Sequence, residues 1–143
     1  MKIKIVAFAL LAFFFGGCLP AANRTSAPIP TATLAPGVGG LSGQIQRAAQ
    51  TWPGQPLRIY AAAYYGEPDG GGFYMLDPDR DPGAPLAADG SFTLDSLPPG
   101  SYLLVVGPSA EQGRRVVDAD QQPALFLVQT GTWQELGTLA LEP

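Results

Sequence analysis

Apolar residues between positions 39 and 143 come in short runs, and this spacing constrains the fold more than any other feature of the chain. The runs are about four to eight residues long, and clusters of Gly, Pro, Asp and Ser, which favour turns, separate them. No part of this region repeats apolar residues at the period of an amphipathic helix. We therefore predict an all-β fold, a single antiparallel β-sandwich of about 7–8 strands.

Residues 56–64 show the strand pattern most clearly, because two sets of side chains alternate along them. Alternation with period two places one set in the core and the other in solvent. The set predicted to face inward is Leu57, Ile59, Ala61 and Ala63, and the set predicted to face outward is Arg58, Tyr60, Ala62 and Tyr64. The other predicted strands cover residues 41–46, 73–76, 91–94, 102–106, 114–117, 124–128 and 134–141.

A strand between two turn signals lies in residues 89–102. Asp89-Gly90 suits a tight hairpin turn, and Pro98-Pro99-Gly100 favours a second turn because Pro restricts φ and Gly does not. Tyr102 follows the second turn, where its hydroxyl can bond a backbone group, as in a tyrosine corner. The side chains of this segment that we expect in the core are Phe92, Leu94 and Leu97.

This segment, DGSFTLDSLPPGSY, resembles the signature dG-x-F-x-f-x-x-L-pp-G-x-Y of carboxypeptidase-regulatory-like domains. Residues 41–45, 53–57 and 134–139 resemble the opening strand, a connecting loop and the closing strand of the same family. The resemblance implies that residues 39–143 form one Ig-like, transthyretin-like sandwich, grouped with CnaB-like domains. It implies no catalytic residue, since the internal isopeptide bond of some CnaB-like domains needs a Lys and none follows position 4.

The first residues of the chain have the organisation of a secretory signal. Residues 1–4 contain two lysines, residues 5–15 are uninterrupted apolar, and two glycines precede Cys18, the single cysteine. An apolar run of about 11 residues is too short to span a bilayer core, which requires about 20 helical residues. The segment therefore indicates a signal peptide rather than a membrane-spanning helix.

The sequence Phe15-Gly16-Gly17-Cys18 resembles the lipobox of bacterial lipoproteins. The resemblance implies a signal peptide over residues 1–17 and a diacylglyceryl group, carrying palmitate-like chains, on the thiol of Cys18. Two or three such chains would anchor the protein, because each buried CH₂ contributes about 0.8 kcal/mol. We expect an extracytoplasmic location on the cell membrane, or on the outer membrane of a bacterium with two membranes. The alternative is an ordinary secretory signal cleaved after Ala22.

Residues 18–38 read as the lipidated cysteine and a linker rich in Pro, Thr and Ala, which lacks the apolar pattern that a packed face requires. Proline-rich spacers run extended at about 3.1 Å per residue. We therefore expect this segment to connect the lipid anchor to the domain of residues 39–143.

Charge and composition exclude several classes of function. After residue 17 the chain has six arginines and twelve acidic residues, a charge of −6 that disfavours nucleic acid as a partner. It has no His and no second Cys, which excludes the usual zinc, copper and haem sites and His-dependent nucleophilic catalysis. Without Lys it cannot form a Schiff base. We predict that the protein is not an enzyme and needs no cofactor.

Three aspartates form the one candidate metal site. Asp77, Asp79 and Asp81 stand at alternate positions, as in one kind of calcium loop. The remainder of that loop does not match, because Pro82 replaces the glycine of the sharp turn and Ala88 stands where a Glu would complete the site. The alternative is that the Asp-Pro pairs only initiate turns. An enzyme that uses a pair of carboxylates, any two of Asp77, Asp79, Asp81 and Asp118, is a further hypothesis.

Aromatic residues are the candidate ligand-binding groups. Trp52, Tyr64, Tyr74 and Trp133 fall in predicted loops or on predicted outward faces, where flat rings can stack on sugars or contact proteins. The alternative is that these rings cover sheet edges or pack under loops.

These features together predict a membrane-anchored extracytoplasmic lipoprotein that acts as a non-catalytic structural or protein-interaction module in the cell envelope. The alternative is a carbohydrate-binding module that uses the exposed aromatic residues, with calcium as a possible aid. Alignment of the rings on one sheet face would favour the second function, and burial of the rings would remove it.

Overall fold

The computed structural model describes residues 34–46, 48–67 and 71–143. The predicted signal peptide, Cys18 and the linker up to residue 33 lie outside the described residues. Every prediction about lipid attachment therefore stays a prediction.

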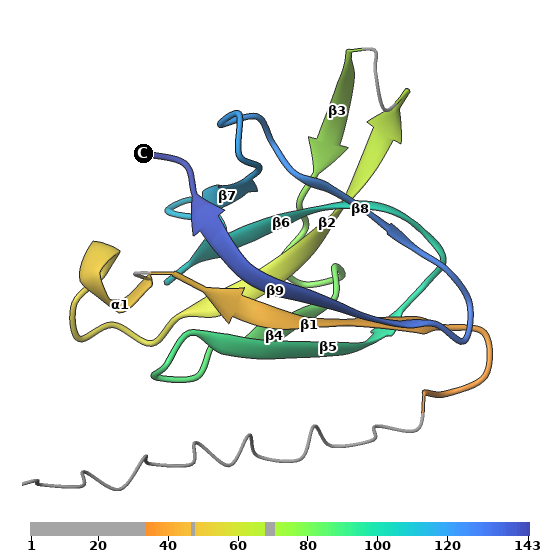
Figure 1. Ribbon diagram of the computed structural model, residues 1–143, viewed down its shortest axis with the longest axis horizontal. Helices are drawn as coiled ribbons and strands as arrows, with labels where there is room; N and C mark the ends of the chain where they lie inside the picture. The colour runs from red at the N-terminus through yellow and green to blue at the C-terminus, as the bar shows by residue number, and fades with distance from the viewer. Residues whose placement is uncertain (1–33, 47, 68–70) are drawn as a thin grey trace, which may run out of the picture. The chain divides into compact units, whose positions relative to one another are not determined.

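The described residues form nine strands and one short helix, as Figure 1 shows. The all-β prediction is confirmed. The elements are β1 (Gly39–Ile45), α1 (Ala48–Thr51), β2 (Arg58–Gly66), β3 (Gly72–Met75), β4 (Gly83–Pro85), β5 (Ser91–Leu97), β6 (Gly100–Gly107), β7 (Arg114–Val117), β8 (Leu125–Val128) and β9 (Trp133–Leu141). Eight strands match predicted segments. The ninth, β4, was missed because it has only three residues, follows Pro82 and ends in Pro85, and so shows no alternation.

The strands belong to one continuous sheet in the order β3-β2-β6-β7-β9-β1-β5, with β4 bonded to β2 and β8 bonded to β6. The sheet curls, so that its last strand, β5, lies beside β4 (Figure 1). Pairing of Val116 with Leu141 joins β7 to β9 and makes the sheet continuous where a two-sheet sandwich has a gap.

The prediction of a wholly antiparallel sheet is wrong at one pair. Strands β1 and β9 run parallel, with Leu41 opposite Gln134 and Ile45 opposite Leu139. They are the first and last strands of the domain, so no tight turn joins them and nothing imposes the antiparallel direction of a hairpin. The result is a mixed sheet.

One hydrophobic core fills the inside of the curl. Its members come from most strands, and the largest fully buried side chains include Leu41, Ile59, Leu97, Leu104 and Val116. No buried side-chain nitrogen or oxygen among the described residues lacks a hydrogen-bond partner. Apolar burial therefore stabilises the domain without a disulfide.

The opposite face of the central strands is also buried, which corrects the predicted orientation along β2. Leu57, Ile59 and Ala61 are buried as predicted, but Tyr60 and Ala62, predicted to face solvent, are 6% and 0% exposed. Gly83 of β4 packs against the Tyr60 ring, and Arg58 lies over it at 5.8 Å from the ring centre. Alternation of apolar and polar residues predicts one buried face, so it does not predict a strand that is buried on both faces.

The two turns around β5 form as expected. Asp89 Oδ1 accepts hydrogen bonds from the Ser91 backbone N–H at 2.9 Å and the Ser91 hydroxyl at 2.7 Å. The Tyr102 hydroxyl donates to the Pro98 carbonyl at 2.8 Å, which is the hydrogen bond of the predicted tyrosine corner. The Asp89 bonds fix the turn that begins β5, and the Tyr102 bond fixes the turn between β5 and β6.

Candidate functional site

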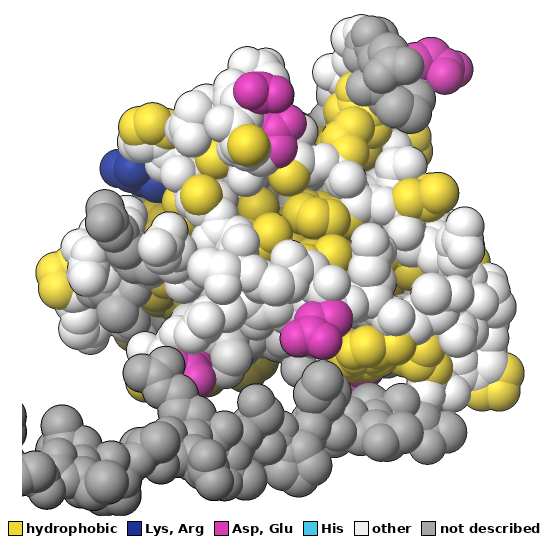
Figure 2. Space-filling model, in the orientation of Figure 1, with side chains coloured by type: hydrophobic (Ala, Val, Ile, Leu, Met, Phe, Trp, Pro, Cys, Tyr) yellow, Lys and Arg dark blue, Asp and Glu magenta, His cyan; other side chains and the backbone are white. Residues whose placement is uncertain are grey.

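A hollow of about 610 Å³ opens on the outer face of the sheet, between the β2–β3 hairpin and the segment from β7 to β8. Figure 2 shows apolar side chains gathered in this part of the molecular surface. The residues that line the hollow are Tyr64, Gly71, Gly72, Phe73, Tyr74, Leu103, Arg115, Gln122, Pro123 and Leu125.

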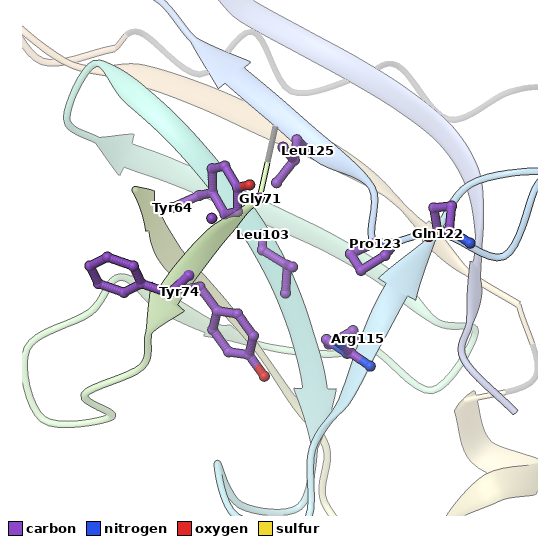
Figure 3. A pocket seen from close by; sticks show the side chains of 10 residues that line it. Tyr64, Gly71, Tyr74, Leu103, Arg115, Gln122, Pro123 and Leu125 are labelled. Atoms are coloured by element: carbon purple, nitrogen blue, oxygen red, sulfur yellow. The ribbon is translucent and has the colours of Figure 1, made fainter. Parts of the chain in front are cut away.

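Register across four strands places the apolar part of the hollow. Tyr74 of β3 lies directly opposite Tyr64 of β2, and Leu103 of β6 lies opposite Leu125 of β8. Leu103 also pairs with Ala62, two residues before Tyr64, so all these side chains share one face of the sheet. Leu103, only 2% exposed, forms the floor, with the two tyrosines on one side (Figure 3).

Polar groups stand on the opposite wall and at the rim. In Figure 3 Arg115, Gln122 and Pro123 lie across the hollow from the two tyrosines. Within the described residues, neither tyrosine hydroxyl and no atom of the Gln122 side chain has a hydrogen-bond partner. The hollow therefore combines apolar walls with polar groups that are free to bind a ligand, as small-molecule sites do.

An ion pair orients Arg115. Its Nη2 lies 2.7 Å from Glu142 Oε2, and its Nε donates to the same oxygen at 2.8 Å. Hydrogen bonding to Glu142 raises the pKa of Arg115. Burial by itself would raise the pKa of Glu142, but hydrogen bonds from Arg115 outweigh burial and hold that pKa below its usual range. Nη1 of Arg115 is left without a hydrogen bond to a described residue.

Close packing of glycine shapes the hairpin side of the hollow. The Tyr64 hydroxyl and ring lie against Gly72, where an added Cβ would collide with them. Gly66, with φ of 154°, faces Gly72 across the hairpin. Gly72 thus leaves room for the Tyr64 ring.

The two tryptophans predicted as ligand-binding residues do not join the tyrosines. Trp52 lines a separate hollow of about 310 Å³ beside Leu57 and packs against the core. Trp133, in β9, packs its ring on Gly40 and donates from Nε1 to the Ser42 hydroxyl at 3.1 Å. Both rings are partly buried, which is the packing alternative that the sequence left open.

The three aspartates shape their own turn. Asp81 Oδ2 accepts a hydrogen bond from the Asp77 backbone N–H at 2.7 Å, and Asp77 Oδ1 accepts one from the Asp79 N–H at 3.1 Å. Arg80 lies 3.6 Å from the Asp77 carboxylate. In the described part of the chain no three His, Cys, Asp or Glu side chains come together as a metal-ligating group. This geometry adds nothing in favour of calcium.

Asp118, the remaining candidate carboxylate, also serves a turn. Its Oδ1 accepts hydrogen bonds from the backbone N–H groups of Asp120 and Gln122, both at 2.9 Å. Neither Asp118 nor any of Asp77, Asp79 and Asp81 lines the hollow between the β2–β3 hairpin and the segment from β7 to β8.

A second exposed apolar surface was not predicted. Strand β2 continues to Gly66, so that it and β3 project from the rest of the sheet (Figure 1). Tyr65, Phe73 and Met75, which we call the hairpin patch, are 52%, 60% and 62% exposed. The rings of Tyr65 and Phe73 stack with centres 5.4 Å apart and planes at 26°. The signal in the sequence was the alternation after residue 72, which puts Phe73 and Met75 on one face.

No protein-family model matches this sequence, and no curated protein is significantly similar to it. Among solved structures, a 9R-lipoxygenase from Cyanothece PCC8801 is similar over 73% of this chain, at 15% identity and a TM-score of 0.36. The matched part makes up 16% of the lipoxygenase chain. None of the helical segments in the described residues is long and apolar enough to cross a bilayer.

Proposed function

We propose that this protein is a lipid-anchored extracytoplasmic lipoprotein whose domain acts as a non-catalytic protein-interaction module. The resemblance of residues 15–18 to a lipobox supports the anchor. The tyrosine-corner bond of Tyr102 and the turn at Asp89 support a carboxypeptidase-regulatory-like fold, a transthyretin-like sandwich whose two sheets are joined by β7 and β9.

The hairpin patch is the observation that carries the interaction role. Tyr65, Phe73 and Met75 are all more than half exposed on a hairpin that projects from the sheet. Exposed aromatic and Met side chains on one surface are characteristic of protein interfaces. A hairpin that only closed a sheet would not need them, because exposed apolar side chains add nothing to the stability of the core.

Localisation tests the anchor. We expect the full chain to partition into the detergent phase with cell membranes and the Cys18→Ser variant to be released or to retain its uncleaved signal. Ala22→Ser, which leaves the thiol in place, is the control. If Cys18→Ser is cleaved and still partitions into the detergent phase as the unmodified chain does, the lipoprotein assignment is wrong.

Site-specific photocrosslinking in intact cells tests the interaction role. A photoreactive amino acid at Phe73 is expected to give a discrete crosslinked band of an identifiable envelope protein. The matched control is the same amino acid at Leu127, which is 61% exposed on β8, against 60% for Phe73. Equal crosslinking from both positions would contradict a specific role for the hairpin patch.

Carbohydrate binding is the second candidate, and the pair of tyrosines in the hollow favours it. Tyr64 and Tyr74 stand side by side on one sheet face, opposite Gln122 and Arg115, and no described residue bonds their hydroxyls. Aromatic rings with polar groups around them suit the apolar face and hydroxyls of a sugar.

A glycan-array screen of the full chain, with calcium and again with chelator, tests this candidate. We expect Tyr74→Ala to reduce glycan binding by about tenfold or more, which corresponds to about 1.4 kcal/mol. Leu127→Ala, outside the hollow, is expected to leave it unchanged. Binding that is lost with chelator would bring the Asp77–Asp81 turn into the site, and an array without any binding would remove the candidate.

A further inference from the structure

Strand β3 stands at one end of the sheet, and its outer edge has no partner among the described residues. It pairs only with β2, from Gly66 opposite Gly72 to Ala63 opposite Met75. No other backbone hydrogen bond to residues 72–75 joins it to the described chain. In an antiparallel pair only alternate residues bond to the neighbour, so the others direct their N–H and C=O groups outward. β3 therefore presents donors and acceptors that no described residue pairs with.

The other end of the sheet is protected, which sets β3 apart. β4 lies beside β5, and the Ala87 N–H donates to the Ser91 carbonyl at the start of β5 at 2.9 Å. β5 also carries a charge, the exposed Asp95. β3 has no charge, no Pro and no bulge, and its four residues are all exposed. Such an edge is a template for strand pairing.

Side chains on both faces of β3 determine what a paired strand would contact. Phe73 and Met75 lie on the face of the hairpin patch, whereas Tyr74 lies on the opposite face, at the hollow. A strand added along β3 would place alternate side chains beside Phe73 and next to Tyr74. Both environments are apolar, so a matching strand carries apolar residues on both faces.

Acidic residues near both ends of β3 indicate which residues should flank the partner strand. The uncharged β3 lies between Glu67 and the turn that contains Asp79, and neither of these two carboxylates has a hydrogen bond or ion pair in the described residues. The chain as a whole has a net charge of −4. Basic residues flanking an apolar centre would therefore complement both ends of β3, whereas a second copy of this acidic chain would repel it.

We propose that β3 binds an extended segment of a partner polypeptide by strand addition, with an apolar centre flanked by Lys or Arg. Main-chain hydrogen bonds to the open edge supply affinity, and the hairpin patch and the Tyr74 side supply selectivity. This inference rests on the proposed interaction role and names the kind of partner that the role requires.

Defined peptides titrated against the full chain in detergent test the proposal. The probe is Arg-Val-Thr-Val-Tyr-Val-Arg with a fluorescent label, and binding is followed by anisotropy. We expect a dissociation constant on the order of 100 μM and at least about tenfold weaker binding when Glu replaces both arginines. Methylation of the central amide nitrogens is expected to abolish binding, because it removes the donors that pair with the edge.

Three variants separate the edge from the rest of the surface. Phe73→Lys puts a charge on the exposed edge and is expected to weaken binding about tenfold or more, as is Met75→Lys. Leu127→Lys changes an equally exposed apolar residue of β8 and is expected to leave binding within about twofold. All three positions are exposed, so the variants retain the core.

Three outcomes would overturn strand addition. These are failure of the Arg-flanked peptide to bind at about 1 mM, equal binding of the N-methylated peptide, and a self-association that Phe73→Lys abolishes, which would assign the edge to a second copy. If the peptides fail while crosslinking from position 73 still yields one identified protein, strand addition is wrong and the interaction role remains. If neither peptide binding nor crosslinking from position 73 is detected, both strand addition and the interaction role are wrong.

Discussion

Single residues hold the turns of this domain through local geometry. Gly90 has φ of 84°, a conformation that side chains with a Cβ rarely adopt, and an added Cβ would collide with the Ile45 carbonyl. The Ile45 N–H in turn donates to the Gly90 carbonyl at 2.8 Å. The hairpin before β5 and the end of β1 therefore depend on the same glycine. The turn was predictable from Asp89-Gly90, but its contact with β1 was not, since 45 residues of chain separate the partners.

Replacing Gly90 by Ala is expected to lower the free energy of unfolding by about 2–3 kcal/mol, because backbone strain and a collision with Ile45 add. Urea denaturation measures the change. Gly131→Ala is the matched control, since Gly131 has φ of 70° but open space around its Cβ position. Gly131→Ala introduces backbone strain without a collision and is expected to lower the free energy of unfolding by about 1 kcal/mol. Equal decreases in the free energy of unfolding of the two variants would show that the contact with β1 does not contribute to stability.

At the scale of elements, the sequence pattern predicted where the strands lie but not which strands pair with each other. Eight of the nine strands fall on predicted segments, because period-two alternation and turn residues are local properties. The parallel pairing of β1 with β9 and the small strand β4 depend on contacts between distant residues. The same limit applies to the candidate site: Tyr64 and Tyr74 were named from their positions on strands, but nothing local placed Arg115 or Gln122 beside them.

The ion pair between β7 and the residue after β9 makes stability depend on pH. Because the pKa of Glu142 is lowered on folding, its contribution is present above the ordinary carboxyl pKa and is lost as pH falls through the lower, folded value. We expect Glu142→Gln to reduce stability at pH 7 by less than about 1 kcal/mol, since both side chains are partly exposed. The difference from the unmodified protein should vanish at low pH.

Thermal unfolding at a series of pH values from about 7 to 3 checks this prediction. Glu135→Gln, on the exposed face of β9 and without a hydrogen bond or ion pair to a described residue, is the matched control and should follow the unmodified chain throughout. A gap between Glu142→Gln and the unmodified protein that widens in acid would contradict the assigned sign.

For the molecule as a whole, the core inside the curled sheet and the smaller apolar layer outside it have different roles. The inner core joins residues from strands at both ends of the chain, so the domain should unfold as a unit. The outer layer, with Leu103 at its base, opens into the hollow. Stability therefore resides inside the curl, and the candidate binding surfaces lie outside it.

Two neighbouring leucines test this division. Leu104→Ala, in the core, is expected to cost about 2–5 kcal/mol because it leaves a cavity. Leu103→Ala, at the base of the hollow, is expected to cost less, since the space it vacates joins an open hollow instead of a sealed cavity. Urea denaturation followed by two spectroscopic probes measures both. Separate transitions for the two probes would contradict a single core.

The sequence by itself determined the class of fold, most strand positions and the turns around β5, because alternation and turn residues act over a few residues. The N-terminal signal stays a prediction. Tertiary structure alone decided the parallel closure of β1 on β9, the burial of Tyr60 and Ala62, and the grouping of Tyr64, Tyr74 and Arg115 around one hollow. Those features arise where distant strands meet, and which strands meet depends on how the whole sheet curls around its core.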